Sequence, residues 1–215
     1  GMTGKFFFIN KKNTKYKTSF YYDINEDKDK KHDRVIFNLS RNQKLIYNDI
    51  RKFGFIKLVQ KLNLDQNLHL KNLGPEPLEK KFNSSYFKQY IINKNRSIKD
   101  LLMDQKFISG LGNIYVNEIL FFSGIKPLKK VKNLSESEIR KIIKFTKKIL
   151  RKAIALGGSS IKNFSSDNGK KGLFQQHFRV YGKKGDKCSK KSCGNNIIKF
   201  VISNRATFYC DKCQK

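Results

Sequence analysis

All four cysteines of the chain lie within its last 28 residues, in two close pairs. Their spacing is Cys188-x4-Cys193-x16-Cys210-x2-Cys213. Two pairs of thiols separated by an insert of hairpin length suit a tetrahedral metal ion, because each pair supplies two sulfurs from one turn. We therefore predict one structural Zn²⁺ held by Cys188, Cys193, Cys210 and Cys213, with no position left for a substrate. The alternative is two disulfides in a secreted protein, although nothing else in the sequence is secretory.

The insert between the cysteine pairs has the pattern of a β-hairpin. An apolar run, Ile197–Ile202, is followed by a polar turn at Ser203-Asn204 and a second run, Arg205–Tyr209. Arg205 at the hairpin turn would be a rigid probe for a phosphate, because the metal fixes the strands behind it. The alternative is that Arg205 is a solvated turn charge.

A second candidate anion site is the segment Gly110-Leu111-Gly112-Asn113, which predicts a tight turn feeding a helix. Backbone N–H groups at a helix start favour an anion, and Asn113 would aim its amide at a phosphate. Taken alone, a turn of this composition is usually only a turn.

Further helices are predicted from capping residues and apolar spacing. Asn83-Ser84-Ser85 and Ser97-x-x-Asp100 begin two short helices. Ser135-x-x-Glu138 begins the longest helix, whose apolar stripe is core and which Gly157-Gly158 ends. The first 60 or so residues instead indicate strands, with turn signals between them; the predicted strands are Phe6–Ile9, Arg34–Leu39, Lys44–Tyr47 and Phe53–Val59. The stiff Gly74-Pro75-Glu76-Pro77 marks a domain boundary.

Charge is the strongest compositional signal. The 215 residues carry 47 Lys and Arg against 17 Asp and Glu, a formal net charge of +30. Coding bias toward Lys does not by itself deplete acidic residues, so a polyanionic partner is expected. Nucleic acid is favoured over a membrane because no long apolar segment or basic amphipathic anchor is visible. The expected location is the cytosol, where cysteines stay reduced.

Candidates for a nucleophile or an acid–base pair are poor. The cysteines are assigned to metal, and His32, His69 and His177 show no spacing typical of a triad. Glu76 and Glu118 are interpreted as caps or salt-bridge partners rather than catalysts. The residues alone therefore indicate a zinc-containing nucleic-acid-binding protein without a visible catalytic centre.

A series of motifs, taken together and in order, resembles formamidopyrimidine-DNA glycosylases, bacterial base-excision repair enzymes. The resemblance extends from Gly1 to Lys215. The motifs are Leu73-Gly74-Pro75-Glu76-Pro77-Leu78, Leu102-Met103-Asp104-Gln105, Gly110-Leu111-Gly112-Asn113-Ile114-Tyr115, Phe174-Gln175-Gln176 with Val180-Tyr181-Gly182, and Arg205-Ala206-Thr207-Phe208-Tyr209-Cys210-x-x-Cys213-Gln214.

The resemblance implies a bifunctional DNA glycosylase and apurinic/apyrimidinic-site lyase whose amino-terminal Pro attacks the damaged nucleoside, helped by the adjacent Glu and a later Lys. These groups are not present among the 215 residues, and Gly1-Met2-Thr3-Gly4 resembles a motif well inside the family's first domain. We therefore expect a chain lacking the amino-terminal part, which binds oxidised-purine DNA with little or no glycosylase or lyase activity. The sequence leaves open whether Gly1 is native.

Several DNA-binding positions of the family match this chain. By resemblance, the residues that fill the hole left by a flipped-out lesion are Met2, Arg51 and Phe53. By the same resemblance, the residues that contact DNA elsewhere are His32, Lys94, Asn113 and Arg205. Asn113 matches a phosphate-gripping residue. Arg205 matches the zinc-hairpin Arg that contacts phosphate and is the proton donor of the second strand-cleavage elimination. Ser165–Leu173 resembles the lid over 8-oxoguanine, although Leu173 stands where an aromatic residue is common. The Cys188–Cys193 gap is wider than the family's.

The expected fold is α+β in three parts: a partial β-sandwich (1–72), a helical helix–two-turns–helix domain with the lid loop (73–182), and a β-hairpin zinc finger (183–215). The expected partner is damaged double-stranded DNA, with self-association through exposed sheet edges. Two alternatives stay open. One is a non-enzymatic zinc-containing DNA-binding protein, and the other is the related endonuclease VIII branch.

Overall fold

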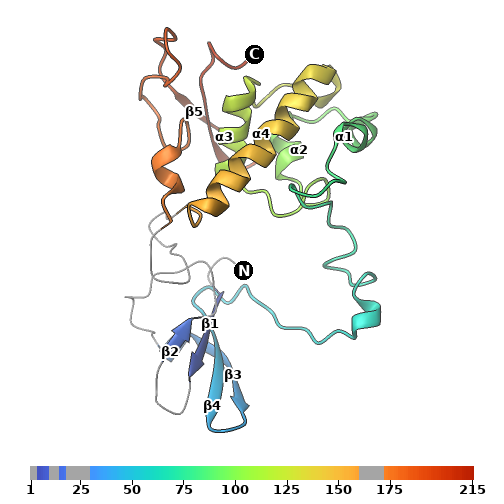
Figure 1. Ribbon diagram of the computed structural model, residues 1–215, viewed down its shortest axis with the longest axis vertical. Helices are drawn as coiled ribbons and strands as arrows, with labels where there is room; N and C mark the ends of the chain where they lie inside the picture. Colours follow the sequence, from blue (N-terminus) through green and yellow to red (C-terminus); the bar gives the residue numbers. More distant parts are fainter. Residues whose placement is uncertain (1–3, 10–14, 18–29, 160–171) are drawn as a thin grey trace. The chain divides into compact units, whose positions relative to one another are not determined.

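The computed structural model describes residues 4–9, 15–17, 30–159 and 172–215 (Figure 1). The chain divides into two compact units. Unit 1 comprises residues 1–59 with 153–176, and unit 2 comprises residues 60–152 with 177–215.

Unit 1 is built on a four-stranded antiparallel sheet in the order β2-β1-β4-β3. Its strands are β1 (Gly4–Ile9), β2 (Lys15–Lys17), β3 (Asp33–Leu39) and β4 (Gln43–Asp49). A 3₁₀ turn, η1 (Lys30–His32), precedes β3. Three of the four predicted strands are therefore confirmed within a residue or two. The sandwich to which they were assigned stays a prediction.

The fourth predicted strand is wrong, because residues 53–59 form no strand. The chain turns instead after β4, where the buried Asp49 carboxylate accepts hydrogen bonds from the backbone N–H of Arg51 (3.3 Å) and Gly54 (2.9 Å). Only Gly fits at position 54, since a Cβ there would lie 1.7 Å from the Tyr47 hydroxyl oxygen. The apolar residues that suggested a strand, such as Phe55 and Leu58, are exposed.

The core of unit 1 is small. Among its described sheet residues, Phe7, Ile46 and Tyr47 are the buried apolar side chains. The outer strand β3 leaves a row of apolar side chains exposed, namely Val35, Ile36, Phe37 and Leu39. Burying apolar surface stabilises a fold by roughly 25 cal/mol per Å². Because the apolar side chains of β3 are exposed, they contribute little to the stability of this sheet.

Unit 2 carries most of the helical structure. Its helices are α1 (Ser84–Ile91), α2 (Ile98–Met103), α3 (Asn113–Ser123) and α4 (Glu136–Ala155), the last three residues of which belong to unit 1. The 3₁₀ turns η2 (Lys61–Asn63) and η3 (Val131–Asn133) also lie in unit 2, whereas η4 (Phe174–His177) belongs to unit 1 except for His177. A two-stranded antiparallel hairpin follows, formed by β5 (Ile198–Ile202) and β6 (Arg205–Tyr209).

The predicted helix starts are confirmed by their caps. Asn83 accepts from the backbone N–H of Tyr86 (3.0 Å), and Ser97 accepts from that of Asp100 (3.1 Å). At the start of α4, Ser135 and Glu138 form a complete capping box, each side chain accepting from the other's backbone N–H. Local sequence therefore fixes where these helices begin.

The core of unit 2 is deep and largely apolar. Around Phe107, rings from α1 and the segment before it meet edge to face, with centroid distances of 4.9 Å to Phe87 and 6.0 Å to Phe82. Ile142 and Ile149 of α4 and Val116 and Ile119 of α3 are also buried. No helix of the described residues has the length and apolar character to cross a membrane.

Candidate nucleic-acid interface and cysteine cluster

The four cysteines converge as their spacing predicts. Their Sγ atoms all lie within 4.8 Å of one another, with separations of 3.2 Å for Cys193–Cys213, 3.5 Å for Cys193–Cys210 and 3.9 Å for Cys188–Cys213. None of the four is in a disulfide. Tetrahedral zinc with sulfur at about 2.3 Å places its ligands at separations of this order, so the cluster fits one Zn²⁺.

The pKa values of the thiols reflect how closely the four sulfurs lie. Burial and the neighbouring thiols raise the pKa of Cys213 to about 12, whereas the backbone N–H of Asn195 and the Cys213 thiol lower the pKa of Cys193 to about 7. Sulfurs this close repel one another as thiolates unless a positive charge lies among them. The shell around them is apolar, with Phe121, Val180 and Phe208 buried against the cysteines.

The hairpin behind the cluster has the predicted tight turn. Ser203 and Asn204 have φ values of 46° and 57°, as the favoured two-residue hairpin turn requires. The hydroxyl of Ser203 donates to an Asp100 carboxylate oxygen of α2 over 2.7 Å. The hairpin tip is therefore tied to the helical part of unit 2.

Two asparagines of α3 connect the start of that helix to β6. The Asn113 amide donates to the carbonyl oxygen of Ala206 (3.0 Å). One turn further on, Asn117 donates to the Asn113 carbonyl (2.7 Å) and accepts from the backbone N–H of Phe208 (2.7 Å). One of the two N–H groups of the Asn113 amide is therefore used for positioning β6, which leaves the other for a ligand.

A buried lysine of α2 makes a second connection to the same strand. The Lys99 ammonium donates to the Ala206 carbonyl (3.1 Å) and the Thr207 hydroxyl (2.6 Å), and its side chain is 1% exposed. Burial lowers the pKa of Lys99 to about 8, and the nearby Arg205 acts in the same direction. Together with the asparagines, Lys99 holds the residues that follow Arg205 in one position.

The turn before α3 is braced by Gln105. Its side chain accepts from the Gly110 N–H (2.7 Å) and donates to the Leu111 carbonyl (3.0 Å). Gly112 occupies the N-cap position, so no side chain caps the first N–H groups of α3. α3 has 11 residues, and the N–H groups of its first turn, which no side chain caps, are a favourable place for an anion.

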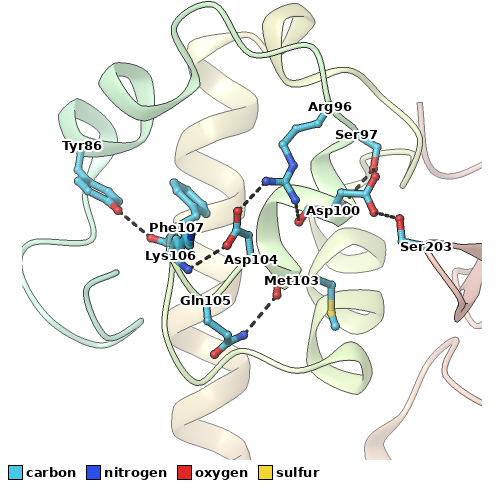
Figure 2. A network of polar contacts seen from close by, with 10 residues as sticks. All are labelled: Tyr86, Arg96, Ser97, Asp100, Met103, Asp104, Gln105, Lys106, Phe107 and Ser203. Atoms are coloured by element: carbon cyan, nitrogen blue, oxygen red, sulfur yellow. Dashed lines mark hydrogen bonds and ion pairs between the residues drawn. The ribbon is translucent and has the colours of Figure 1, made fainter. Parts of the chain in front are cut away.

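Arg205 is exposed and lines a cavity of about 570 Å³ between α2 and the hairpin tip. Its guanidinium forms no hydrogen bond or ion pair with the residues that the structure describes. Figure 2 shows the α2 side of this region, where Arg96 binds the Asp104 carboxylate (2.7 Å) and the Asp100 carbonyl (2.6 Å). The Asp104 carboxylate is thus already paired with Arg96, whereas the Asp100 carboxylate accepts from the hydroxyls of Ser97 and Ser203.

Glu118 anchors the segment after η4. Its carboxylate is fully buried and accepts from the backbone N–H groups of Arg179 (2.8 Å), Val180 (3.0 Å) and Tyr181 (2.9 Å). Burial raises the pKa of the Glu118 carboxyl, and the three donors oppose that rise. The sequence suggests that Glu118 is a cap or a salt-bridge partner. Like a cap, it accepts hydrogen bonds from backbone N–H groups, but these lie about sixty residues further along the chain.

In unit 1, the predicted wedge residues lie on the loop that Asp49 holds. The Arg51 guanidinium lies 5.1 Å from the centroid of the Phe53 ring, and Phe53 is 71% exposed. Lys52 between them has a φ of 59°. This loop presents an aromatic ring and a cation together.

Two other predicted DNA contacts are half-buried. In unit 1, His32 lies at the end of η1, and its Nδ1 is 3.3 Å from an Arg34 guanidinium nitrogen. In unit 2, the Lys94 ammonium lies 4.5 Å from the centre of the Tyr90 ring. Met2 and residues 165–171 of the predicted lid lie outside the described residues, and Leu173 at its end is exposed.

The residues that sequence reasoning missed are Lys99, Asn117, Gln105 and Asp49. Gln105 and Asp49 bond to turns within a few residues of themselves, whereas Lys99 and Asn117 lie within helices and bond to a distant segment. For Lys99 and Asn117 the partner is β6, about a hundred residues away. The one available signal was a polar side chain within an otherwise apolar helix stretch.

Comparison with known proteins gives a consistent result. Residues 1–56 match the formamidopyrimidine-DNA glycosylase N-terminal domain, and residues 73–165 match the formamidopyrimidine-DNA glycosylase H2TH domain. A formamidopyrimidine-DNA glycosylase of Rickettsia bellii is 44% identical over 186 residues, which are 86% of this chain and 67% of that protein. The chain belongs to the formamidopyrimidine-DNA glycosylase family. This family is one of DNA glycosylases that act in base-excision repair.

Further members of the family support the assignment over the whole chain. A formamidopyrimidine-DNA glycosylase from a Bradyrhizobium species is 35% identical over 100% of this chain and 75% of its own length. The Lactococcus lactis enzyme in a complex with an abasic site containing DNA has a TM-score of 0.79 at 34% identity, covering 100% of this chain and 72% of that one. Its G226P variant, bound to a Fapy-dG containing DNA, has a TM-score of 0.80. The chain thus spans about two thirds to three quarters of the length of these proteins.

Proposed function

We propose that the chain binds damaged double-stranded DNA by gripping its phosphates with unit 2. Two groups make the grip, namely the N-terminus of α3 with Asn113, and the guanidinium of Arg205. The observation that carries the proposal is the hydrogen bond from Asn113 to Ala206, the residue next to Arg205. It joins the two groups into one structure that needs no reorganisation when a phosphate arrives.

The chemistry of both groups suits a phosphate. Arg205 offers a planar fork of N–H donors and has no partner among the described residues that would have to be displaced. The α3 N-terminus adds backbone N–H groups and the positive end of the helix dipole. Phosphate contacts fix position without reading sequence, as a search for damage within any sequence requires.

Zinc would be held by Cys188, Cys193, Cys210 and Cys213, and its contribution would be structural. Lys212 donates to the Cys193 carbonyl over 2.9 Å, and the carboxy-terminal Gln214 binds both the Cys210 N–H and the Ile125 carbonyl. These contacts fasten the cluster to the loop after α3. The metal would therefore fix the base of the hairpin, while the α3 asparagines and Lys99 fix its tip.

The loop of Arg51 and Phe53 supplies the second part of the proposed function. An exposed aromatic ring beside a cation is suited to fill the space that a flipped-out base leaves and to pair with the orphaned base. We extend this to oxidised purines, 8-oxoguanine and formamidopyrimidine, on the strength of family membership. His32, Lys94 and Met2 are proposed as further DNA contacts on the same basis.

The test is equilibrium binding of a duplex containing one 8-oxoguanine, measured at several salt concentrations. Arg205→Ala is expected to weaken binding by about 10- to 100-fold, because a hydrogen bond to a charged group contributes about 1.5–3 kcal/mol. It should also reduce the salt slope by about one. Arg205→Lys keeps the positive charge but loses the planar pair of guanidinium donors. Its affinity should therefore lie between those of the parent protein and Arg205→Ala.

Lys132→Ala is the matched control, because Lys132 is exposed in η3 and its loss also removes one positive charge. If Arg205→Ala and Lys132→Ala weaken binding equally, only overall charge matters and the phosphate grip is refuted. Borohydride trapping on the same duplex tests a separate expectation, that these 215 residues by themselves form no covalent adduct. That expectation, and the elimination role of Arg205, stay predictions.

A further inference from the structure

Helix α4 carries a dense row of basic side chains that the proposed grip does not use. From Arg140 to its end the helix contains seven Lys or Arg residues and no acidic residue. Six of them are exposed, namely Arg140, Lys141, Lys144, Lys148, Arg151 and Lys152. We define these six residues as the α4 basic face.

Most of this charge is uncompensated. Arg140 pairs with Glu136, and the Lys152 ammonium is near His177. The other four, Lys141, Lys144, Lys148 and Arg151, make no ion pair or hydrogen bond with any described residue. A helix gains nothing from like charges at spacings of three and four residues, since such pairs are mildly destabilising. The α4 basic face is therefore suited to binding a polyanion.

The α4 basic face points away from the proposed grip. Ile142, Ile149 and Ala153 are buried. Each is two positions from Arg140 or Arg151, which is about 200° around an α-helix, so the buried side lies opposite the α4 basic face. At the edge of that buried side, the Phe145 ring stacks on Phe122 of α3 with a centroid distance of 5.9 Å.

On α3, the contacts with α4 and with β6 lie on opposite sides. Asn113 binds β6, and Phe122 follows it by nine residues, which is about two and a half turns or half a circle. A duplex held by Asn113 and Arg205 is thus separated from the α4 basic face by the body of unit 2.

We propose that the α4 basic face binds a second segment of duplex DNA, so that one protein molecule bridges two segments. The row from Arg140 to Lys152 is about 18 Å long, since the rise is about 1.5 Å per residue. DNA carries one charge per about 1.7 Å of duplex axis, so several phosphates lie within reach of six cations. The contacts would be independent of sequence and of damage, because none of these side chains is held for base recognition.

An anionic membrane is the less suitable partner. A helix that lies in a membrane surface must bury an apolar face in lipid. The apolar face of α4 is already buried within the protein, with Ile142 fully covered. The exposed side of α4 offers charge alone, as binding to a phosphate backbone requires.

The consequence would be direct transfer between DNA segments during the search for damage. A molecule that holds the first segment at Asn113 and Arg205 captures the second with α4, and then releases the first. The off-rate from labelled DNA should therefore rise with the concentration of unlabelled competitor duplex. This inference rests on the proposed function only in taking DNA as the ligand.

The experiment uses two short duplexes with different fluorophores, whose energy transfer reports a bridged complex on the full chain. The test variant is K141Q/K144Q/K148Q/R151Q, in which Gln preserves helix propensity. Circular dichroism and a thermal melt check that it is folded. The matched control, K71Q/K132Q/K184Q/K191Q, removes the same charge at four exposed lysines outside α4.

The α4 variant is expected to weaken capture of the second duplex by about tenfold or more at moderate salt, while affinity for the first changes by about twofold at most. The control variant should keep the bridged complex. Undiminished bridging by the α4 variant would overturn the proposal. So would an equal loss of affinity for the first duplex, since α4 would then belong to the first site.

Two further outcomes separate this inference from the proposed function. If Arg205→Ala leaves first-duplex binding intact, the grip is wrong, and bridging lost with the α4 variant would still support the second site. If the chain binds phosphatidylserine vesicles through α4 and captures no second duplex, the second site is not for DNA and the inference fails.

Discussion

The two units hold their candidate DNA-binding residues in different ways. In unit 2, Arg205 and Asn113 are fixed by long-range hydrogen bonds from α2 and α3 to β6 and by the cysteine cluster behind it. In unit 1, the Arg51–Phe53 loop depends on the buried Asp49 carboxylate beside a small sheet core. The proposed phosphate grip therefore lies on a scaffold held by long-range hydrogen bonds, whereas the proposed filling of the duplex depends on a locally anchored loop.

The largest expected effect is loss of the metal. Removing zinc with a chelator, or changing the buried Cys210 to Ser, should release the hairpin that carries Arg205 and abolish DNA binding. Structural zinc commonly contributes folding free energy outright. Metal analysis should find one zinc per chain, and binding should return when zinc is restored to the chelated protein. Full binding by metal-free protein would show that the helical contacts alone hold the hairpin.

The next effect should come from the anchor after η4. Glu118→Gln keeps the size of the side chain but replaces one acceptor oxygen with a donor that faces backbone N–H groups. We expect the free energy of unfolding to fall by about 2–4 kcal/mol, because buried donors lose their partner. Urea unfolding of the exposed control Glu79→Gln should differ from the parent by about 0.5 kcal/mol or less. Equal behaviour of the two variants would contradict the importance of this anchor.

A smaller and more selective effect is expected from unit 1. Phe53→Ala should weaken binding of a duplex with an abasic site by about 5- to 50-fold, since stacking on a base contributes about 1–3 kcal/mol. Its affinity for undamaged duplex should change little, because the proposed grip on the phosphates lies in unit 2. Leu58→Ala removes another exposed apolar side chain from the same segment and serves as control. A loss by Phe53→Ala that is the same for both duplexes would assign this ring to general binding.

A further prediction concerns Lys99 and pH. In the unfolded chain a lysine titrates near 10.5, whereas in the folded protein the pKa of Lys99 is about 8. Between these values the unfolded state binds more protons, so the free energy of unfolding should rise as pH increases from about 8 to about 10.5. The difference between the parent and Lys99→Met isolates this contribution from other lysines. A difference that is constant with pH would show that the Lys99 pKa is not depressed.

Much of unit 2 could be predicted from local sequence. Asn83, Ser97 and Ser135 mark helix starts, and the polar pair Ser203-Asn204 marks the hairpin turn, because capping and turn chemistry depend on neighbours in the chain. The cysteine spacing likewise predicts the cluster. Glu118 and Lys99 could not be placed in this way, since their partners lie about 60 and 108 residues further along the chain.

The strand predicted for residues 53–59 in unit 1 is wrong for a related reason. Residues 53–59 form an apolar and aromatic run typical of a strand, but a strand forms only against a partner with free ladder groups. Here the chain has just been turned by Asp49, and the N–H of Gly54 is used by that carboxylate rather than by a neighbouring strand. Apolar content alone does not supply the missing partner.

Asn113 and Arg205 are proposed to act as one phosphate-binding structure, joined through Ala206. A double-mutant cycle tests it most directly, with the duplex affinities of Asn113→Ala, Arg205→Ala and the combined variant measured at low salt. Because Asn113→Ala also releases the strand that positions Arg205, the combined loss should be smaller than the sum of the single losses by about 0.5 kcal/mol or more. Strictly additive losses would mean that the two groups bind DNA independently, contrary to this account.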